Sequence, residues 1–80
     1  QLTARDFNWI AWDVPPRQFR CSAKARYRHP EQPCEVTVRE DGTVEVVFDQ
    51  PQRAITSGQA VVLYQGDMVL GGGTITEAIR

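Results

Sequence analysis

The stretch from residue 19 to residue 28 alternates between apolar and polar residues without interruption. A period of two is typical of a β-strand that has one face on a core and the other face in water. Five further segments share the composition of strands: 7–12, 34–39, 43–48, 60–64 and a last strand that begins at 68–70 and finishes at 74–75. No stretch shows the 3.6-residue period of a helix. We therefore predict an all-β fold, a small six-stranded antiparallel β-barrel formed by residues 1–80 as one domain.

Glycines mark two places in this pattern. Asp41-Gly42 lies between two predicted strands and suits a two-residue hairpin turn, which needs positive φ. The run Gly71-Gly72-Gly73 is followed by neither a lysine nor a helical pattern, so it does not match a phosphate-binding loop. We interpret it as a kink or bulge in the last strand, or as a site where another backbone comes close.

The polar face of the 19–28 segment is cationic. No acidic residue occurs between Asp13 and Glu31, although the net charge of the chain is −1. Such a local surface suits a polyanion, and nucleic acid is the first candidate. The alternative is a solvated face, or one paired with Glu35 and Glu45 on a neighbouring strand. The cations of this face are Arg20, Lys24, Arg26 and Arg28.

The two cysteines fall on the apolar phase and are expected to be small buried hydrophobes with reduced thiols. A hairpin of residues 19–28 and 34–40 would put Arg28 near Cys34. Cys21 would then lie about 20 Å from Cys34, at ~3.4 Å per residue. A disulfide needs Cα atoms within about 7 Å, so this register excludes a Cys21–Cys34 bond.

Other chemistry is sparse. The single histidine, His29, sits beside a proline and is expected to be a solvated loop residue, so we predict no metal site. We likewise expect no catalytic residue and no cofactor-binding site in this segment. Trp9 and Trp12 are three residues apart, so on a strand they would face opposite sides, one toward the core and one toward a rim or another domain.

No apolar run is long enough to span a membrane, and no signal peptide opens the sequence, so we expect no membrane partner. Because the two cysteines are expected to be reduced, we expect a cytoplasmic protein. The chain begins with Gln1 and enters a strand pattern soon after, so we expect it to be a piece of a longer protein.

Five separated motifs, taken in order, resemble the C-terminal domain of the tRNA-specific 2-thiouridylases. Ser57 stands where that family usually has proline, and Met68-Val69 replaces a pair that commonly ends in cysteine. The resemblance covers nearly the whole chain. The motifs are Cys21–Arg28, Gln32–Cys34, Phe48–Gln59, Tyr64–Asp67 and Leu70–Ile75.

The resemblance implies a larger parent enzyme, a sulfurtransferase that 2-thiolates the wobble uridine of the lysine, glutamate and glutamine tRNAs. It implies an N-terminal ATP-binding adenylation domain that uses ATP with Mg, a central domain, and a sulfur-donor protein as partner. The present segment would be the C-terminal barrel, similar to the second domain of translation elongation factors, with no catalysis of its own. The alternative is an interdomain scaffold or protein-interaction barrel.

The resemblance also implies tRNA contacts at three positions: Arg26, Tyr27 and Gln59. Lys24 and Arg28 belong to the same cationic face and join them as candidate nucleic-acid-binding residues. Strand alternation points Tyr27 inward, so its contact would come from the hydroxyl or backbone at a rim. Arg53 lies in a family motif and is equally suited to a turn or an interdomain salt bridge.

Overall fold

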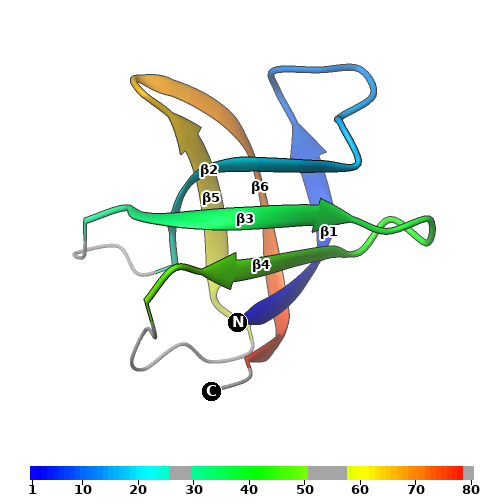
Figure 1. Ribbon diagram of the computed structural model, residues 1–80. Coiled ribbons are helices and arrows are strands. Elements are labelled where there is room, and N and C mark those ends of the chain that lie inside the picture. Colours follow the sequence, from blue (N-terminus) through cyan, green and yellow to red (C-terminus); the bar gives the residue numbers. More distant parts are fainter. Residues whose placement is uncertain (26–29, 51–57, 79–80) are drawn as a thin grey trace.

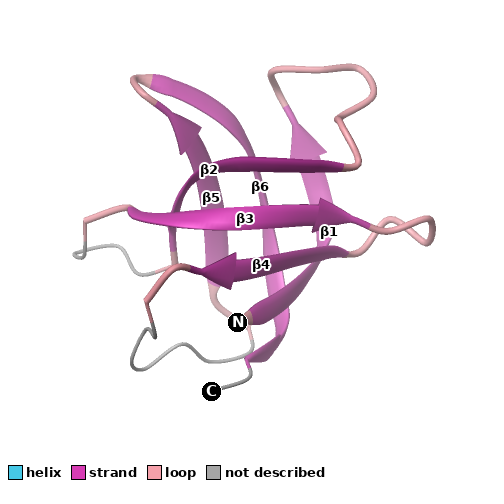
Figure 2. Cartoon of the chain, viewed as in Figure 1, coloured by secondary structure: helices cyan, strands magenta, loops and turns pink. Residues whose placement is uncertain are grey.

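The computed structural model describes residues 1–25, 30–50 and 58–78. Six antiparallel strands close into a barrel in the order β1-β4-β3-β2-β5-β6, which confirms the predicted fold (Figure 1). All regular structure in the described part is strand (Figure 2). The strands are β1 Leu2–Trp9, β2 Gln18–Lys24, β3 Gln32–Val38, β4 Val44–Phe48, β5 Ala60–Gln65 and β6 Met68–Ala78.

The barrel consists of two three-stranded layers that cross one another. In Figure 1, β2, β3 and β4 run across the front, while β5, β6 and β1 run behind them in a different direction. Six residue pairs join β2 to β3, and six join β5 to β6, over the described residues. The layers are joined by shorter ladders of three described pairs each, between β1 and β4 and between β2 and β5.

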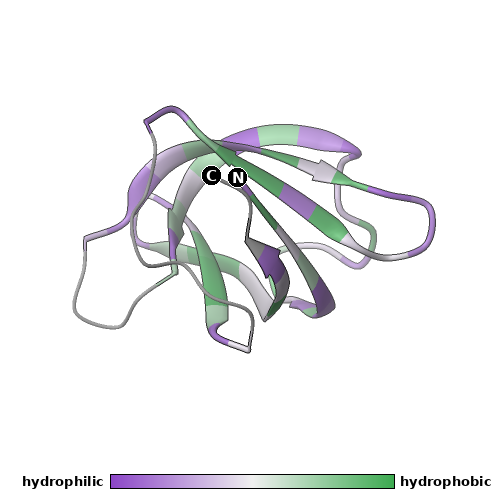
Figure 3. Ribbon diagram, turned by 90° about the horizontal axis from the view of Figure 1, so that it is seen from below, coloured by the Kyte–Doolittle hydropathy of each residue, from purple (hydrophilic) through white to green (hydrophobic). Residues whose placement is uncertain are grey.

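Alternation of side chains builds the core. Val44, Val46 and Phe48 point inward from β4, as the period-two pattern predicts, while Glu45 and Val47 lie on the outer side. Hydrophobic and hydrophilic residues alternate along the strands in the same way in Figure 3. The buried core residues are Leu2, Ala4, Ala23, Cys34, Val36, Val44, Val46, Phe48, Val61, Leu63, Leu70 and Ile75.

Two strands, β1 and β2, end earlier than predicted. β1 ends at Trp9 instead of residue 12, because the chain turns away after its last pairing with Gly71. β2 ends at Lys24 instead of residue 28, although the alternation of residue types continues further. Neither end is marked by a change of hydrophobic pattern, so periodicity alone places it wrongly.

The glycine run confirms the interpretation of a close backbone approach. A Cβ on Gly71 would lie 2.7 Å from the Asn8 carbonyl oxygen, and one on Gly73 would lie 2.7 Å from the Arg5 carbonyl oxygen. The strand is not interrupted there, and β6 runs through all three glycines. Opposite them β1 carries a bulge between Arg5 and Asn8, with Asp6 at a φ of 55°.

The β3–β4 hairpin has a longer turn than predicted. The Gly42 N–H donates to the Arg39 carbonyl, and the Arg39 N–H donates to the Thr43 carbonyl. Only Gly42 has positive φ, at 89°, whereas Asp41 does not. This is the three-residue loop in which a type I turn ends in a left-handed glycine, so the predicted two-residue turn is wrong.

The two tryptophans lie together instead of facing opposite sides. Trp12 lies beyond the end of β1, where the Ile10 and Ala11 N–H groups both donate to the Leu70 carbonyl, so strand alternation does not apply to it. The ring centroids are 5.9 Å apart for Trp9–Trp12, 5.1 Å for Trp12–Phe19 and 4.7 Å for Phe7–Trp9. These partly buried rings pack against the core, and we call them the aromatic cluster.

In the described segments, no helix of sufficient length and hydrophobicity to cross a membrane is present.

Candidate nucleic-acid interface

β2 carries the described part of the predicted cationic face. Arg20 is exposed on its outer side, and Lys24 is half-buried at its C-terminal end. Lys24 pairs in register with Val62 of β5. The alternation of β2 therefore places both cations on the outer surface of the barrel, as predicted.

Arg20 is neutralised by a carboxylate that the sequence analysis did not identify. Its guanidinium donates to an oxygen of Asp49, at the end of β4, and Glu35 is its cross-strand neighbour. The hydrogen bond and the negative charge of Asp49 raise the pKa of Arg20. Glu35 instead accepts a hydrogen bond from Gln18, at 3.2 Å. The cationic face is thus not uniform along β2.

The same pairing extends to the other described arginines. Each of them has a carboxylate within 4.0 Å, whereas no such partner lies next to Lys24 in the described part of the chain. Among the described lysine and arginine side chains, Lys24 is therefore the one without a carboxylate partner in the described residues. The ion pairs are Arg5–Asp6 at 3.6 Å, Arg17–Glu40 at 3.4 Å, Arg39–Glu45 at 3.0 Å and Arg20–Asp49.

Gln59 is fixed at the start of β5 by its backbone. Its carbonyl accepts from the Ile75 N–H at 2.8 Å, and the Gly58 N–H donates to the Ile75 carbonyl at 2.8 Å. Gly58 has a φ of 89°, so the chain turns into β5 through a left-handed residue. Since Lys24 pairs with Val62, Gln59 and Lys24 lie toward the same end of the β2–β5 ladder.

Three of the five candidate residues lie outside the described residues: Arg26, Tyr27 and Arg28. Arg53 lies outside them as well. Their contacts remain predictions. The described structure places Lys24 and Gln59 toward the same end of the β2–β5 ladder, with Lys24 opposite Val62, three residues after Gln59. The chain enters the segment with Arg26 and Arg28 directly after Ala25.

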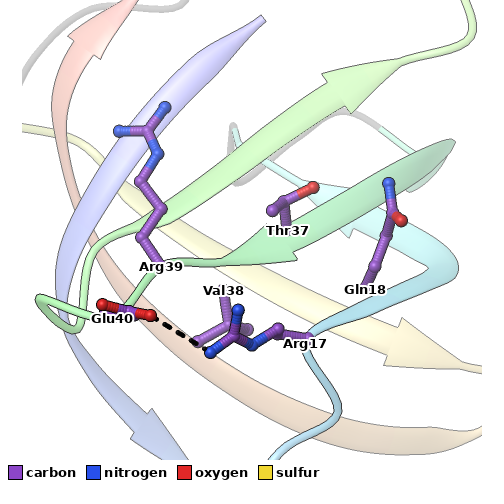
Figure 4. A pocket seen from close by; sticks show the side chains of 6 residues that line it. All are labelled: Arg17, Gln18, Thr37, Val38, Arg39 and Glu40. Carbon is purple, nitrogen blue, oxygen red and sulfur yellow. Dashed lines mark hydrogen bonds and ion pairs between the residues drawn. The ribbon is translucent and has the colours of Figure 1, made fainter.

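A shallow cavity of about 360 Å³ lies at the other end of β2, where β2 begins and β3 ends (Figure 4). Arg17 and Glu40 pair across it, and Arg39 is engaged by Glu45. Its two cations are therefore already neutralised. In the described residues no group of three His, Cys, Asp or Glu side chains lies close enough to hold a metal ion.

The cysteines contradict the predicted register. Cys21 and Cys34 are direct cross-strand partners, and their Sγ atoms lie 3.8 Å apart. The predicted hairpin was wrong because β2 ends at Lys24 instead of residue 28 and β3 begins at Gln32 instead of residue 34. The chain therefore reverses earlier than predicted, and every pair shifts. Both thiols are free, with Cys34 buried and Cys21 half-buried.

The chain matches one protein family and is similar to proteins of one name. Residues 1–75 match the family model described as the aminomethyltransferase beta-barrel domain. The chain is 60% identical over 74 residues to the tRNA-specific 2-thiouridylase MnmA of Francisella philomiragia, which covers 92% of the chain and 21% of that protein. It is 54% identical over 79 residues to the tRNA-specific 2-thiouridylase MnmA of Marinobacter nauticus, which covers 99% of the chain and 20% of that protein.

These matches confirm the resemblance to the 2-thiouridylases that the motifs indicated. The chain spans about a fifth of the length of the curated relatives it matches, at 20% and 21%.

Proposed function

Because the chain belongs to the aminomethyltransferase β-barrel domain family, we propose that it is the tRNA-docking domain of a tRNA-specific 2-thiouridylase. The observation that carries the proposal is the 54–60% identity to proteins of that name over nearly the whole chain. The barrel would contribute contacts to the tRNA backbone, which position the substrate and carry no sequence information. Catalysis would belong to the rest of the parent enzyme.

The proposed parent protein is a tRNA-uridine 2-sulfurtransferase that acts on the wobble uridine of the lysine, glutamate and glutamine tRNAs. An N-terminal domain would use ATP with Mg to adenylate the uridine, and a sulfur-donor protein would supply the sulfur. The present barrel would be its C-terminal domain, packed against the N-terminal and central domains of the same chain in the cytoplasm.

Electrostatics support the choice of surface. Four described arginines are paired with carboxylates, whereas Lys24 has no such partner among residues 1–25, 30–50 and 58–78. Paired cations attract a polyanion weakly, because their field is cancelled within a few ångströms. We therefore place the docking surface at the Lys24 end of β2, with Gln59 toward the same end of the β2–β5 ladder and Arg26, Tyr27 and Arg28 in the segment that follows.

A second candidate function is that of an interdomain scaffold. It is favoured by two exposed apolar residues in the loop between β1 and β2, Ile10 at 66% and Val14 at 82% exposure, beside the aromatic cluster. Under this hypothesis the barrel holds sister domains through that loop, and its basic face is merely solvated.

Titration of fluorescent glutamate tRNA with the chain distinguishes the two. Each phosphate contact lowers log K by about 0.7–0.9 for every tenfold rise in salt concentration. A variant that has lost one contact should therefore lose roughly threefold less affinity than the wild type when the salt is raised from ~50 to ~200 mM. Lys24→Ala and Arg26→Ala are expected to weaken binding and to reduce its salt dependence in this way. Gln59→Ala is expected to weaken binding without changing its salt dependence.

Arg17→Ala is the matched control. It removes the same unit of charge, but from the residue just before β2, at the opposite end of that strand from Lys24, and from an ion pair with Glu40. Docking at the Lys24 end predicts little change in this variant. Equal weakening by Arg17→Ala and Lys24→Ala would indicate unspecific attraction. Binding unaffected by any of the substitutions would favour the scaffold.

A further inference from the structure

The strongest unassigned feature is the pair of thiols in the β2–β3 ladder. Cys21 and Cys34 are the only two cysteines of the chain, and their Sγ atoms approach to 3.8 Å. We propose that they form an oxidisable dithiol, which closes to an intramolecular cross-strand disulfide on reaction with a low-molecular-weight disulfide. This proposal does not rest on the proposed tRNA docking.

The backbone geometry permits the bond. The Val38 N–H donates to the Arg17 carbonyl at 2.7 Å, so Arg17 and Val38 form a hydrogen-bonded pair. Such pairs alternate along an antiparallel ladder, and the register from Gln18 to Ala23 has no shift. Cys21 and Cys34 are therefore also a hydrogen-bonded pair, with Cα atoms about 5.5 Å apart. A disulfide needs a Cα separation of roughly 4.4–6.8 Å.

The side chains need only a small adjustment. Closing the bond brings the two Sγ atoms from 3.8 Å to about 2.05 Å, and the Cα atoms already lie in the permitted range. Rotation about the Cα–Cβ bonds supplies this movement. The strands stay paired on both sides of the site, since Phe19 pairs with Val36 and Ala23 pairs with Gln32.

The two thiols have different roles in the reaction. Cys21 is half-buried and borders solvent, whereas Cys34 is fully buried between β2 and β4. The hydrogen bond with Cys34, assisted by the charge of Arg20, lowers the pKa of Cys21. The same hydrogen bond and burial raise the pKa of Cys34. Cys21 is therefore the thiol that meets the oxidant first.

The reaction balances as two exchange steps. The Cys21 thiolate attacks one sulfur of the small disulfide, forms a mixed disulfide and releases one thiolate. Cys34 then loses its proton, attacks the Cys21 Sγ and expels the second thiolate. The protein thiols lose two electrons and two protons in total, and the small disulfide is reduced to two thiols.

The test measures the equilibrium of the chain with glutathione disulfide and glutathione. Free thiols are blocked with N-ethylmaleimide, and the products are separated by intact mass and peptide mapping. The equilibrium constant is the effective concentration of the two thiols, about millimolar for a short flexible segment. The equilibrium constant of the native chain is expected to exceed that of the chain in denaturant by on the order of a hundredfold. A native value at or below the denatured one would overturn the proposal.

Single substitutions test the assigned roles. Cys34→Ser is expected to stop at the mixed disulfide on Cys21. Cys21→Ser is expected to stay unmodified at Cys34 while folded, and to react in denaturant. Wild-type protein that accumulates the mixed disulfide or a disulfide-linked dimer in place of the internal bond would also contradict the proposal. Because the equilibrium comparison uses only the wild-type chain, poor folding of a variant does not affect it.

Discussion

Gly73→Ala tests how the barrel closes. The added Cβ would lie 2.4 Å from Phe7 Cδ1 and 2.7 Å from the Arg5 carbonyl oxygen. Carbon atoms in ordinary contact are ~3.5–4.0 Å apart, so both neighbours must move. The carbonyl belongs to the bulged part of β1 and cannot move without shifting its pairing with β6.

The expected loss of stability follows from this overlap. Overpacking in a well-packed site lowers the free energy of unfolding by about 1–3 kcal/mol. Replacing glycine by alanine restricts the unfolded chain, which raises the free energy of unfolding by ~0.4–1 kcal/mol. We expect a net loss of about 1.3 kcal/mol for Gly73→Ala, the difference between the middle values of the two ranges. For a domain of this size that corresponds to a fall in Tm of roughly 5–10 °C.

Gly72→Ala is the control on the same strand. Its Cβ would have the Val61 carbonyl oxygen as nearest neighbour at 3.1 Å, and the next atom at 3.6 Å. The contact is tight without overlap, so we expect a change within about 1 kcal/mol of zero. Urea unfolding followed by tryptophan fluorescence measures both variants. Equal stability of Gly73→Ala and Gly72→Ala would refute the closure argument.

A second substitution separates the two overlaps. Phe7→Ala removes the ring that a Cβ on Gly73 would meet at 2.4 Å, while the Arg5 carbonyl stays in place. In the double variant we therefore expect Gly73→Ala to be less destabilising than in the wild type, but still unfavourable. Full recovery would show that the backbone approach imposes no constraint.

Further predictions concern the surface, a turn and the aromatic cluster. Lys24→Ala is expected to reduce the salt sensitivity of tRNA binding by roughly threefold between ~50 and ~200 mM salt, as measured by titration. Hydrogen bonds from the Thr43 hydroxyl and N–H lower the pKa of Asp41 below its ordinary value of 3.8. The carboxylate therefore stabilises the fold above pH 3.8, and the stability difference from Asp41→Asn should shrink as the pH falls below 3.8 in urea unfolding at several pH values. Trp12→Ala removes a half-buried ring 5.1 Å from Phe19, and we expect a loss of about 2 kcal/mol by the same measurement.

The fold was predictable where the hydrophobic pattern and the strand coincide. β4 is the clearest case, since its inward residues alternate and a left-handed glycine precedes it. When apolar and polar residues alternate strictly, the apolar residues all lie on one face of the strand, and that face is the one that is buried. The close approach at the glycine run was predictable for a related reason, because only glycine lets two backbones come so near.

The register of the β2–β3 hairpin was not predictable from the pattern. Residues 25–28 continue the alternation, yet β2 ends at Lys24. Register depends on where the loop begins, and a shift of several residues changes which side chains face each other. The Cys21–Cys34 contact and the Arg20–Asp49 pair both follow from that register, and for this reason the sequence analysis missed them.

The short ladders between the two layers have a consequence for motion and for ligand binding. Over the described residues, three pairs join β2 to β5 and three join β1 to β4, so the layers are expected to separate locally along these seams before either layer frays. Cys21 and Cys34 lie within one layer, so oxidation would not clamp the seams. Lys24 belongs to the front layer and Gln59 to the chain entering the rear one. A tRNA that contacts both would hold the layers together, and slower amide exchange along the β2–β5 seam would report its binding.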